Sequence, residues 1–360
     1  MNATARDRRA VRRLRRGIVP GTHIDSLTVG AEGLLRDLNR LLDSLKGGTA
    51  EVGFVHGEWG MGKTHTLRLI HHLCLRDGYS VAYTNLNGRS AALNHPQRFY
   101  HLVASRIRLQ DNPAGLPFLI DVCVRDTVRR DKLEHWAATN RTDSEFAAAL
   151  YRLLSMWRVP SDAPAHAWSI LVGTDLAWAD YAYKREKALL RLADLGECMA
   201  AVGAGGLVLE LDELETIDQL WNVRSRVGAY GVLGRLFEMR RVLPIFAVTD
   251  RFHRLVEFDL EYKVAPEDVS LSIAARAFLV AWRNRSLRML SPPIFSESLA
   301  HGLVGKIAAL YRAAFGHTAL SVRPAAIVEQ WVKSPRRSPR SLIRRTIHEM
   351  DVARNGFRPA

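Results

Sequence analysis

The stretch that decides the fold is Gly57-Glu58-Trp59-Gly60-Met61-Gly62-Lys63-Thr64. It fits the pattern G-x-x-x-x-G-K-[ST], whose glycines let successive backbone N–H groups turn inward around a polyphosphate. A β-like run over 52–56 precedes this loop, and apolar residues at helical spacing follow it. Strand, loop and helix therefore come in the order that a phosphate-binding loop requires, and the sequence predicts a P-loop NTPase core of the α/β class.

The residues of this loop have expected roles toward a nucleotide. Lys63 is expected to reach the β- and γ-phosphates, and the Thr64 hydroxyl is expected to ligate Mg²⁺. ATP and Mg²⁺ are the predicted cofactors. The predicted cofactor-binding residues are Gly57, Glu58, Trp59, Gly60, Met61, Gly62, Lys63, Thr64 and His65. His65, together with His71 and His72, equally suits a packing or surface role on the helix that follows.

Length and composition indicate a globular protein. The chain has 360 residues, of which 48% are hydrophobic and 24% charged, so it can form one large or two medium domains. No run approaches the roughly 18 apolar residues of a membrane span, and the first residues do not resemble a signal peptide, so we expect a cytoplasmic protein. The isolated Cys74, Cys123 and Cys198 suit buried small side chains better than disulfides or a zinc site.

A positive net charge of +14 favours contact with a polyanion such as DNA. The chain has 43 Arg and only 8 Lys, however, and such a bias also arises from the codon usage of its source. The most basic stretch, 6–16, predicts a helix that ends at Gly17 and Pro20. Its arginines indicate either a solvated helix face or an arm that contacts phosphates.

Two further strands end in polar side chains. The apolar run 207–211 leads into Asp212-Glu213, and the run 243–248 leads into Thr249. A phosphate loop needs such partners: Asp212 is expected to hold Mg²⁺ and Glu213 to polarise the attacking water, with Glu215 as a competitor for that role. Thr249 is expected to sense the γ-phosphate, because a hydroxyl can donate a hydrogen bond to phosphate oxygen.

Arginines supply the remaining site candidates. Ser338 and Pro339 predict the start of a helix that runs to about residue 351, with Arg340 in its first turn. The helix dipole disfavours a cation there, so we expect Arg340 to contact the γ-phosphate. The alternative is that the arginines of 336–345 contact a nucleic-acid backbone. Arg251 or Arg254 could act as an arginine finger in a neighbouring subunit.

These patterns predict three regions. Residues 1–48 hold the basic helix and a linker helix, and residues 49–265 hold the ATPase core. A long helical insertion at about 95–204 separates the second and third strands of the core, because no convincing strand pattern occurs there. Residues 266–360 are expected to form a helical lid with a basic C-terminal segment.

With these motifs, the chain resembles an AAA+ type P-loop ATPase with an additional strand and a catalytic glutamate. Within that class it is similar to the ATP-binding proteins of bacterial BREX phage-defence systems. The matching residues are Gly17-Ile18-Val19-Pro20, Val29-Gly30, Gly57 to His65, Leu209-Glu210-Leu211-Asp212-Glu213-Leu214-Glu215 and Ser338-Pro339-Arg340. One departure is Ala31, where this family often has Arg, so a nucleotide contact from that position is not expected.

The resemblance implies an ATPase that works with other defence-system proteins near DNA. Two alternatives remain open at this point. One is an ATP-dependent DNA-binding adaptor of the type that regulates transposition, and the other is a nucleotide-dependent signalling switch. The sequence also leaves the oligomeric state open, and a homo-oligomer is one alternative.

Overall fold

The computed structural model describes residues 3–18, 20–86, 93–110, 114–140, 142–156, 165–265, 272–284, 287–290, 292, 295–316, 322–335 and 337–355. Val19 and Arg336, which belong to predicted motifs, lie outside these residues. The chain divides into two compact units. Unit 1 comprises 1–37, 55–72 and 290–360, and unit 2 comprises 38–54 and 73–289. The phosphate loop therefore belongs to unit 1 and the acidic pair Asp212-Glu213 to unit 2.

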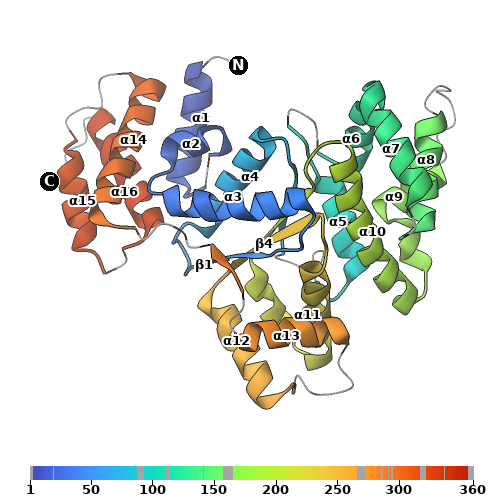
Figure 1. The fold of residues 1–360 in the computed structure, drawn as a ribbon. Coiled ribbons are helices and arrows are strands. Elements are labelled where there is room, and N and C mark those ends of the chain that lie inside the picture. The colour runs from blue at the N-terminus through green and yellow to red at the C-terminus, as the bar shows by residue number, and fades with distance from the viewer. Residues whose placement is uncertain are drawn as a thin grey trace. The chain divides into compact units, whose positions relative to one another are not determined.

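Five strands form one sheet in the order β2-β3-β4-β1-β5, and Figure 1 labels β1 and β4 among them. The strands are β1 (Gly53–His56), β2 (Ser80–Asn85), β3 (Leu207–Asp212), β4 (Val242–Val248) and β5 (Met289–Leu290). β2, β3 and β4 pair in parallel, and every residue of β3 and β4 is buried, as expected for parallel strands covered on both faces. This confirms the predicted α/β class. β5 was not predicted, because two residues carry no periodicity.

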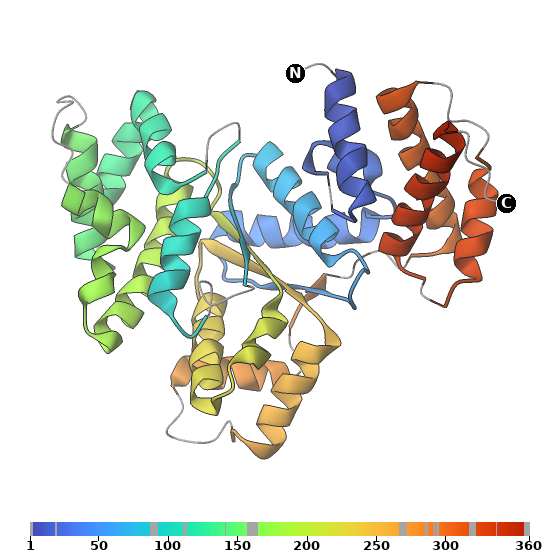
Figure 2. The same cartoon turned by 180° about the vertical axis from the view of Figure 1, so that it is seen from behind.

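Unit 2 contains β2, β3, β4 and most of the helices. A helical segment separates β2 from β3, and further helices follow each of the next two strands (Figure 2). These helices are α5 (Pro96–Arg106), α6 (Leu116–Arg125), α7 (Thr127–Thr139), α8 (Ser144–Met156), α9 (Ala165–Val172), η2 (Asp175–Trp178), α10 (Tyr181–Ala201), η3 (Leu214–Gln219), α11 (Val223–Phe237), α12 (Asp250–Tyr262) and α13 (Ile273–Arg283).

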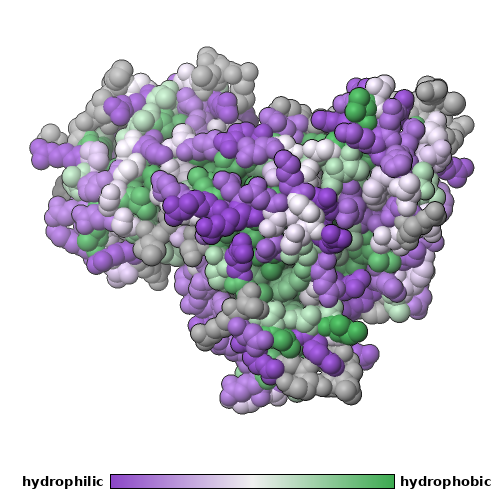
Figure 3. Space-filling view, viewed as in Figure 1, coloured by the Kyte–Doolittle hydropathy of each residue, from purple (hydrophilic) through white to green (hydrophobic). Residues whose placement is uncertain are grey.

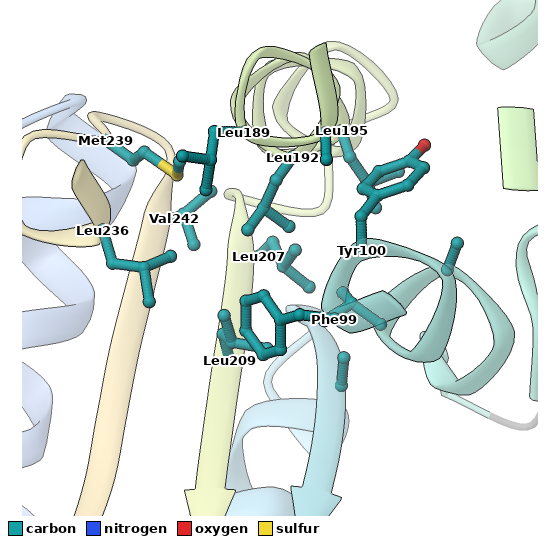
Figure 4. Packing of buried hydrophobic residues seen from close by; sticks show 14 of the residues in the cluster. Phe99, Tyr100, Leu189, Leu192, Leu195, Leu207, Leu209, Leu236, Met239 and Val242 are labelled. Carbon is teal, nitrogen blue, oxygen red and sulfur yellow. The ribbon is translucent and has the colours of Figure 1, made fainter. Parts of the chain in front are cut away.

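The core of unit 2 lies between its sheet strands and the helices α5 and α10. In Figure 4, Leu189, Leu192 and Leu195 of α10 line the side of that helix nearest the strands; Leu192 lies beside Leu207 of β3, and Leu209 lies further along the same strand. The spacing of three residues places the α10 leucines on one helix face, and all five side chains are buried. Full burial of such a side chain stabilises the fold by about 1.5–3 kcal/mol.

A buried arginine joins the helices of the segment between β2 and β3. Arg191 of α10 is fully buried and donates through Nη1 and Nη2 to the two carboxylate oxygens of Asp175, at 2.7 and 2.8 Å. It also donates to the carbonyl oxygen of Ile170 at 3.1 Å and lies 3.6 Å from Asp143. Asp143 in turn accepts hydrogen bonds from two N–H groups in the first turn of α8. One guanidinium thus connects α8, α9, η2 and α10.

Unit 1 contains the helices at the two ends of the chain. They are α1 (Ala3–Arg15), η1 (Gly21–His23), α2 (Ile24–Leu27), α14 (Glu297–Phe315), α15 (Pro324–Val332) and α16 (Pro339–Asn355). α1 packs against α14 and α16 through its buried Ala10, Val11 and Leu14. Gly17 ends this helix as predicted: its φ is +70°, and the next N–H closes the turn on the carbonyl of Arg13 at 2.9 Å.

Two helices run across the division between the units, α3 (Glu32–Gly47) and α4 (Lys63–Arg76). The leucines of α3 form an apolar stripe, in which Leu34, Leu38, Leu41, Leu42 and Leu45 are buried and Leu35 is partly buried. The opposite side of this helix is hydrophilic (Figure 3). The three cysteines are buried free thiols, as predicted. None of the helices among the described residues has the length and apolar character of a membrane span.

Candidate functional site

The phosphate loop connects β1 to α4 in unit 1. Gly60 and Gly62 have φ values of +85° and +99°, a region that side chains with a Cβ rarely adopt. A Cβ added to Gly57 would lie 3.6 Å from the Met61 Cβ and 3.7 Å from the Lys63 Cγ, so it would fill the inside of the turn. α4 begins at Lys63, directly after the loop, and its N-terminal N–H groups carry the positive end of the helix dipole. This backbone is suited to an anion.

Lys63 is held against its own loop. Its ammonium group donates to the carbonyl oxygens of Gly57 and Glu58 at 2.7 and 3.3 Å, and its side chain is 8% exposed. Nζ also lies 5.7 Å from the ring centroid of Trp59, which is 62% exposed. The loop thus holds a cation beside its backbone, and such a charge can balance that of a polyphosphate. Thr64 follows as the second residue of α4.

The first turn of α16 lies against the same loop. Ser338 and Ser341 form a reciprocal cap: the Ser341 N–H donates to Ser338 Oγ, and the Ser338 N–H donates to Ser341 Oγ, each at 3.2 Å. This confirms Ser338 as the N-cap. A Cβ added to Gly60 would lie 3.4 Å from Ser338 Oγ and 3.7 Å from the Cβ of Arg340. The cap therefore places the start of α16 beside the loop.

Arg340 extends from this first turn into solvent. Its side-chain carbons lie near Gly17, because a Cβ added there would be 3.5 Å from Arg340 Cγ. The residue is exposed, and within the described part of the chain it makes no ion pair or side-chain hydrogen bond. The structure therefore brings Arg340 to the phosphate loop with its guanidinium uncompensated.

His65 supports the loop from the first turn of α4. Its Nε2 lies 2.9 Å from the Thr28 hydroxyl, and that hydroxyl donates its single proton to the carbonyl oxygen of Ile24 at 2.7 Å. His65 must then be the donor, so its Nε2 carries a proton. Burial lowers the pKa of His65 to about 4, which keeps it neutral at physiological pH. This is the packing role that the sequence left as an alternative to nucleotide contact.

Acid is expected to weaken unit 1 through His65. Because the folded-state pKa is about 4 and the unfolded value about 6.5, the unfolded state binds more protons between these limits. The contribution of the neutral ring to the free energy of unfolding is thus complete above pH 6.5 and is lost as the pH falls toward 4. His65→Gln keeps a hydrogen-bond donor but cannot titrate, so the difference in free energy of unfolding between wild type and variant should fall by about 2 kcal/mol from pH 7 to pH 4.5.

Urea unfolding at the two pH values measures this difference. The comparison with the variant is needed because Asp194 in unit 2 acts in the opposite direction: burial raises its pKa to about 6, so its contribution is lost as pH rises. A wild-type and variant pair with the same pH dependence would show that His65 does not carry the effect.

In unit 2, Asp212 ends β3 with both carboxylate oxygens engaged. Tyr83 of β2 donates its hydroxyl to Oδ2 at 2.9 Å, and the Glu213 N–H donates to Oδ1 at 3.1 Å. Asn85 is the register partner of Asp212 on β2, so Tyr83 and Asn85 share the same sheet face with it. Asp212 is 2% exposed, so its orientation is set by these donors. A carboxylate with a fixed orientation is a suitable oxygen ligand for Mg²⁺.

Glu213 has a backbone conformation that sets it apart. Its φ is +63° and ψ +46°, and it is the one non-glycine residue with positive φ in the described ranges. This conformation costs of order 1 kcal/mol, and Thr216 holds it by donating its hydroxyl and its N–H to the Glu213 carbonyl at 2.9 and 3.0 Å. Strain of this kind clusters at functional sites.

Thr249 lies at the end of the neighbouring strand. It caps α12, is 1% exposed, and its hydroxyl has no hydrogen-bond partner among the described residues. By strand alternation it lies on the face that Glu210 and Tyr83 share, because Ile245 is the partner of Glu210. A buried hydroxyl without a hydrogen-bond partner lowers the stability of the fold by about 1–3 kcal/mol. A hydrogen bond to a ligand would offset this cost.

The predicted site residues fall into two groups. Unit 1 brings together the phosphate loop, His65 and Arg340, and unit 2 brings together Asp212, Glu213 and Thr249. Arg251 is ion-paired with Asp218 of η3, whereas Arg254 is exposed. Sequence reasoning missed Tyr83. Its one signal in the sequence is that it alternates with Asn85. This alternation predicts that both side chains lie on the same face of the sheet, but not which strand pairs with theirs.

Together, the parallel sheet and the glycine-rich loop before α4 are compatible with the core of a P-loop NTPase. Residues 3–155 match the model of a family described as BREX system ATP-binding protein BrxC/D. The family resemblance predicted from the motifs is thereby confirmed over this segment, which includes the phosphate loop and ends before Asp212. No curated protein matches the chain. The family match supports a BREX-related ATP-binding role.

Proposed function

We propose that this chain is a Mg²⁺-dependent ATP hydrolase of the AAA+ type that works in the cytoplasm with other BREX defence proteins, near DNA. The observation that carries the proposal is the phosphate loop, with the Lys63 ammonium held on two loop carbonyls. The strand order, in which β4 separates β3 from β1, supports the AAA+ assignment.

In this proposal the loop from Gly57 to Thr64 binds the phosphates. Backbone N–H groups contact the phosphate oxygens, and Lys63 exchanges its carbonyl partners for the β- and γ-phosphates. Within this loop, the side chains of Trp59 and Met61 are exposed. Arg340 supplies a second positive charge from α16, and its guanidinium has no partner among the described residues, which supports a role as sensor of the γ-phosphate.

The residues that end β3 and β4 carry out hydrolysis in the proposal. Asp212, together with Thr64, would hold Mg²⁺, and oxygen ligands of this kind fit that ion. When bound, Mg²⁺ neutralises phosphate charge. Glu213 accepts a proton from the attacking water, and Thr249 donates its hydroxyl to a phosphate oxygen or to that water. The strained turn at Glu213 and the buried Thr249 hydroxyl support these assignments.

The test of this function is phosphate release by the purified full chain. We expect release that requires ATP and Mg²⁺ and that stops when EDTA removes the metal. Duplex DNA and candidate partner proteins are added in separate arms, because AAA+ type turnover is often coupled to a partner. Negligible release in every arm, with tight ATP binding, would contradict a hydrolase and favour the signalling switch.

Tyr83→Phe is expected to weaken the use of Mg²⁺ specifically. The variant removes the hydrogen bond to Asp212 Oδ2 and leaves the ring in place. Loss of a hydrogen bond that orients a metal ligand typically costs about 10–100-fold in metal affinity, so half-maximal activity should need at least about tenfold more Mg²⁺. Binding of fluorescent ATP, titrated with Mg²⁺, should show the same shift, whereas binding in EDTA should not change.

Tyr79→Phe is the matched control, because Tyr79 donates to a backbone carbonyl, that of Leu42, and not to a carboxylate. It should leave the Mg²⁺ titration unchanged. If Tyr83→Phe and Tyr79→Phe give the same titration as wild type, Tyr83 does not orient the metal ligand.

A further inference from the structure

The positive charge of this protein is concentrated in unit 1. The segments 1–37, 55–72 and 290–360 contain 21 Lys and Arg against 9 Asp and Glu, a surplus of 12 out of the total of 14. Unit 2 is longer but nearly balanced. A codon bias toward arginine would act on both units alike, so it does not account for this distribution.

Within unit 1, α1 and the turn that follows it carry a stripe of four exposed arginines. We call Arg9, Arg12, Arg13 and Arg16 the α1 stripe. Their spacing of three and four residues places them on one helix face, over a length of about 10 Å. None of the four makes an ion pair or side-chain hydrogen bond with the part of the chain that the structure describes.

The other charged residues of α1 are used inside the unit. Arg8 donates to the carbonyl oxygen of Ala314 at 2.8 Å, and Arg15 forms a two-point ion pair with Asp351 at 2.8 and 2.7 Å. Arg6 donates to a backbone carbonyl, and the acid of this helix, Asp7, is paired with His23 at 2.8 Å. The stripe is therefore left without a counter-charge on its own helix, while the arginines beside it fix the helix in place.

The stripe fits the phosphate backbone of a nucleic acid better than a membrane. A helix that binds a lipid surface inserts an apolar face, but Ala10, Val11 and Leu14 are buried against α14 and α16. Single strands are usually bound by aromatic side chains on which bases stack, and the stripe contains none. Guanidinium groups spaced along a rigid helix suit the regular phosphates of a duplex.

We propose that the α1 stripe binds duplex DNA through its phosphate backbone, without sequence preference. This contact would bind unit 1 to DNA, and the phosphates would neutralise the charge of the α1 stripe. It does not depend on ATP hydrolysis, so it can stand or fall separately from the proposed function.

Fluorescence anisotropy with a labelled duplex of about 20 base pairs, at 50–200 mM salt, tests the proposal. Four phosphate contacts should give the full-length protein a log–log salt slope of about −3.6 or steeper, which is about a 100-fold loss of affinity across this range. Replacement of all four stripe arginines by Gln should reduce the slope by about 3 to 4 and weaken binding at least tenfold at 100 mM salt.

The control variant removes the same charge elsewhere. Arg76, Arg125 and Arg235 are exposed in unit 2 and Arg129 is partly exposed, and each pairs with a neighbouring carboxylate. Their replacement by Gln should change affinity less than twofold. Circular dichroism and ATP binding check that both variants are folded, and Lys63→Ala should keep DNA binding, which separates this result from a failure of the ATPase proposal.

Three outcomes would overturn the proposal. The wild-type protein could show no duplex binding at 50 mM salt, or the stripe variant could bind like the control. Tighter binding to a single strand, or binding to acidic phospholipid vesicles without binding to DNA, would assign the stripe to another partner. A log–log salt slope whose magnitude is reduced in the stripe variant, and not in the control variant, supports the proposal.

Discussion

Replacing Glu213 by Gln is expected to lower the rate of ATP hydrolysis by about 10²–10⁴-fold, the range that removal of a general base typically costs. The amide keeps the size of the side chain but cannot accept a proton from water. Asp212 keeps its hydrogen bond from the backbone N–H of residue 213, because that bond does not involve the altered side chain. ATP binding should therefore survive, with an affinity within about threefold of wild type.

Single-turnover hydrolysis, measured beside equilibrium ATP binding, separates these two effects. Glu215→Gln is the matched control, because Glu215 is a neighbouring acid that lies in η3 and is 6% exposed. If Glu215→Gln loses hydrolysis and Glu213→Gln does not, the base has been assigned to the wrong residue. Equal rates in wild type and both variants would remove this turn from the mechanism.

Arg191→Met is expected to be the most destabilising single change in the segment between β2 and β3. Met fills a similar volume, but it leaves Asp175 without its cation and leaves the fully buried Asp143 with Lys187 alone, at 3.4 Å. Breaking a buried pair by removing one partner costs about 3–5 kcal/mol. The free energy of unfolding from urea titration should fall by this amount.

Arg152→Met is the control, because Arg152 is exposed on α8 and such changes usually stay within about 0.5 kcal/mol. The double variant Arg191→Met with Asp175→Leu should lose less than the sum of the single variants, because it also removes the stranded charge. Additive losses, or an Arg191→Met variant as stable as the control, would show that the network does not hold these helices together.

Local chemistry explains what the sequence could predict. The phosphate loop, the glycine that ends α1 and the Ser338 cap each depend on residues within a few positions, so their patterns are complete in the sequence. The strands β1, β3 and β4 were recognisable from apolar runs. β5 was not, since it has two residues and is defined by its neighbour.

The rest depends on contacts between distant parts of the chain. Tyr83 reaches Asp212 only because β2 and β3 pair in one register, and a shift of one residue would turn it to the other face. The sequence around Arg191 does not distinguish it from a solvent-exposed arginine on a helix, because its partners Asp175 and Asp143 are distant in the chain. His65 presents the same difficulty, because its partner Thr28 comes from a different helix. Each of these residues is polar and is fully or partly buried by tertiary structure that no local pattern encodes.

The central claim is that the loop from Gly57 to Thr64 binds ATP through Lys63. Calorimetric titration with a non-hydrolysable ATP analogue tests it most directly, with the wild type, Lys63→Ala and Lys333→Ala compared at equal Mg²⁺. Lys333 serves as control because it is an exposed lysine of unit 1, ion-paired with Glu329.

We predict micromolar binding by the wild type and by Lys333→Ala, and at least a 100-fold loss in Lys63→Ala, which corresponds to about 2.8 kcal/mol of binding free energy. A folded Lys63→Ala variant that binds the analogue as tightly as the wild type would contradict the account.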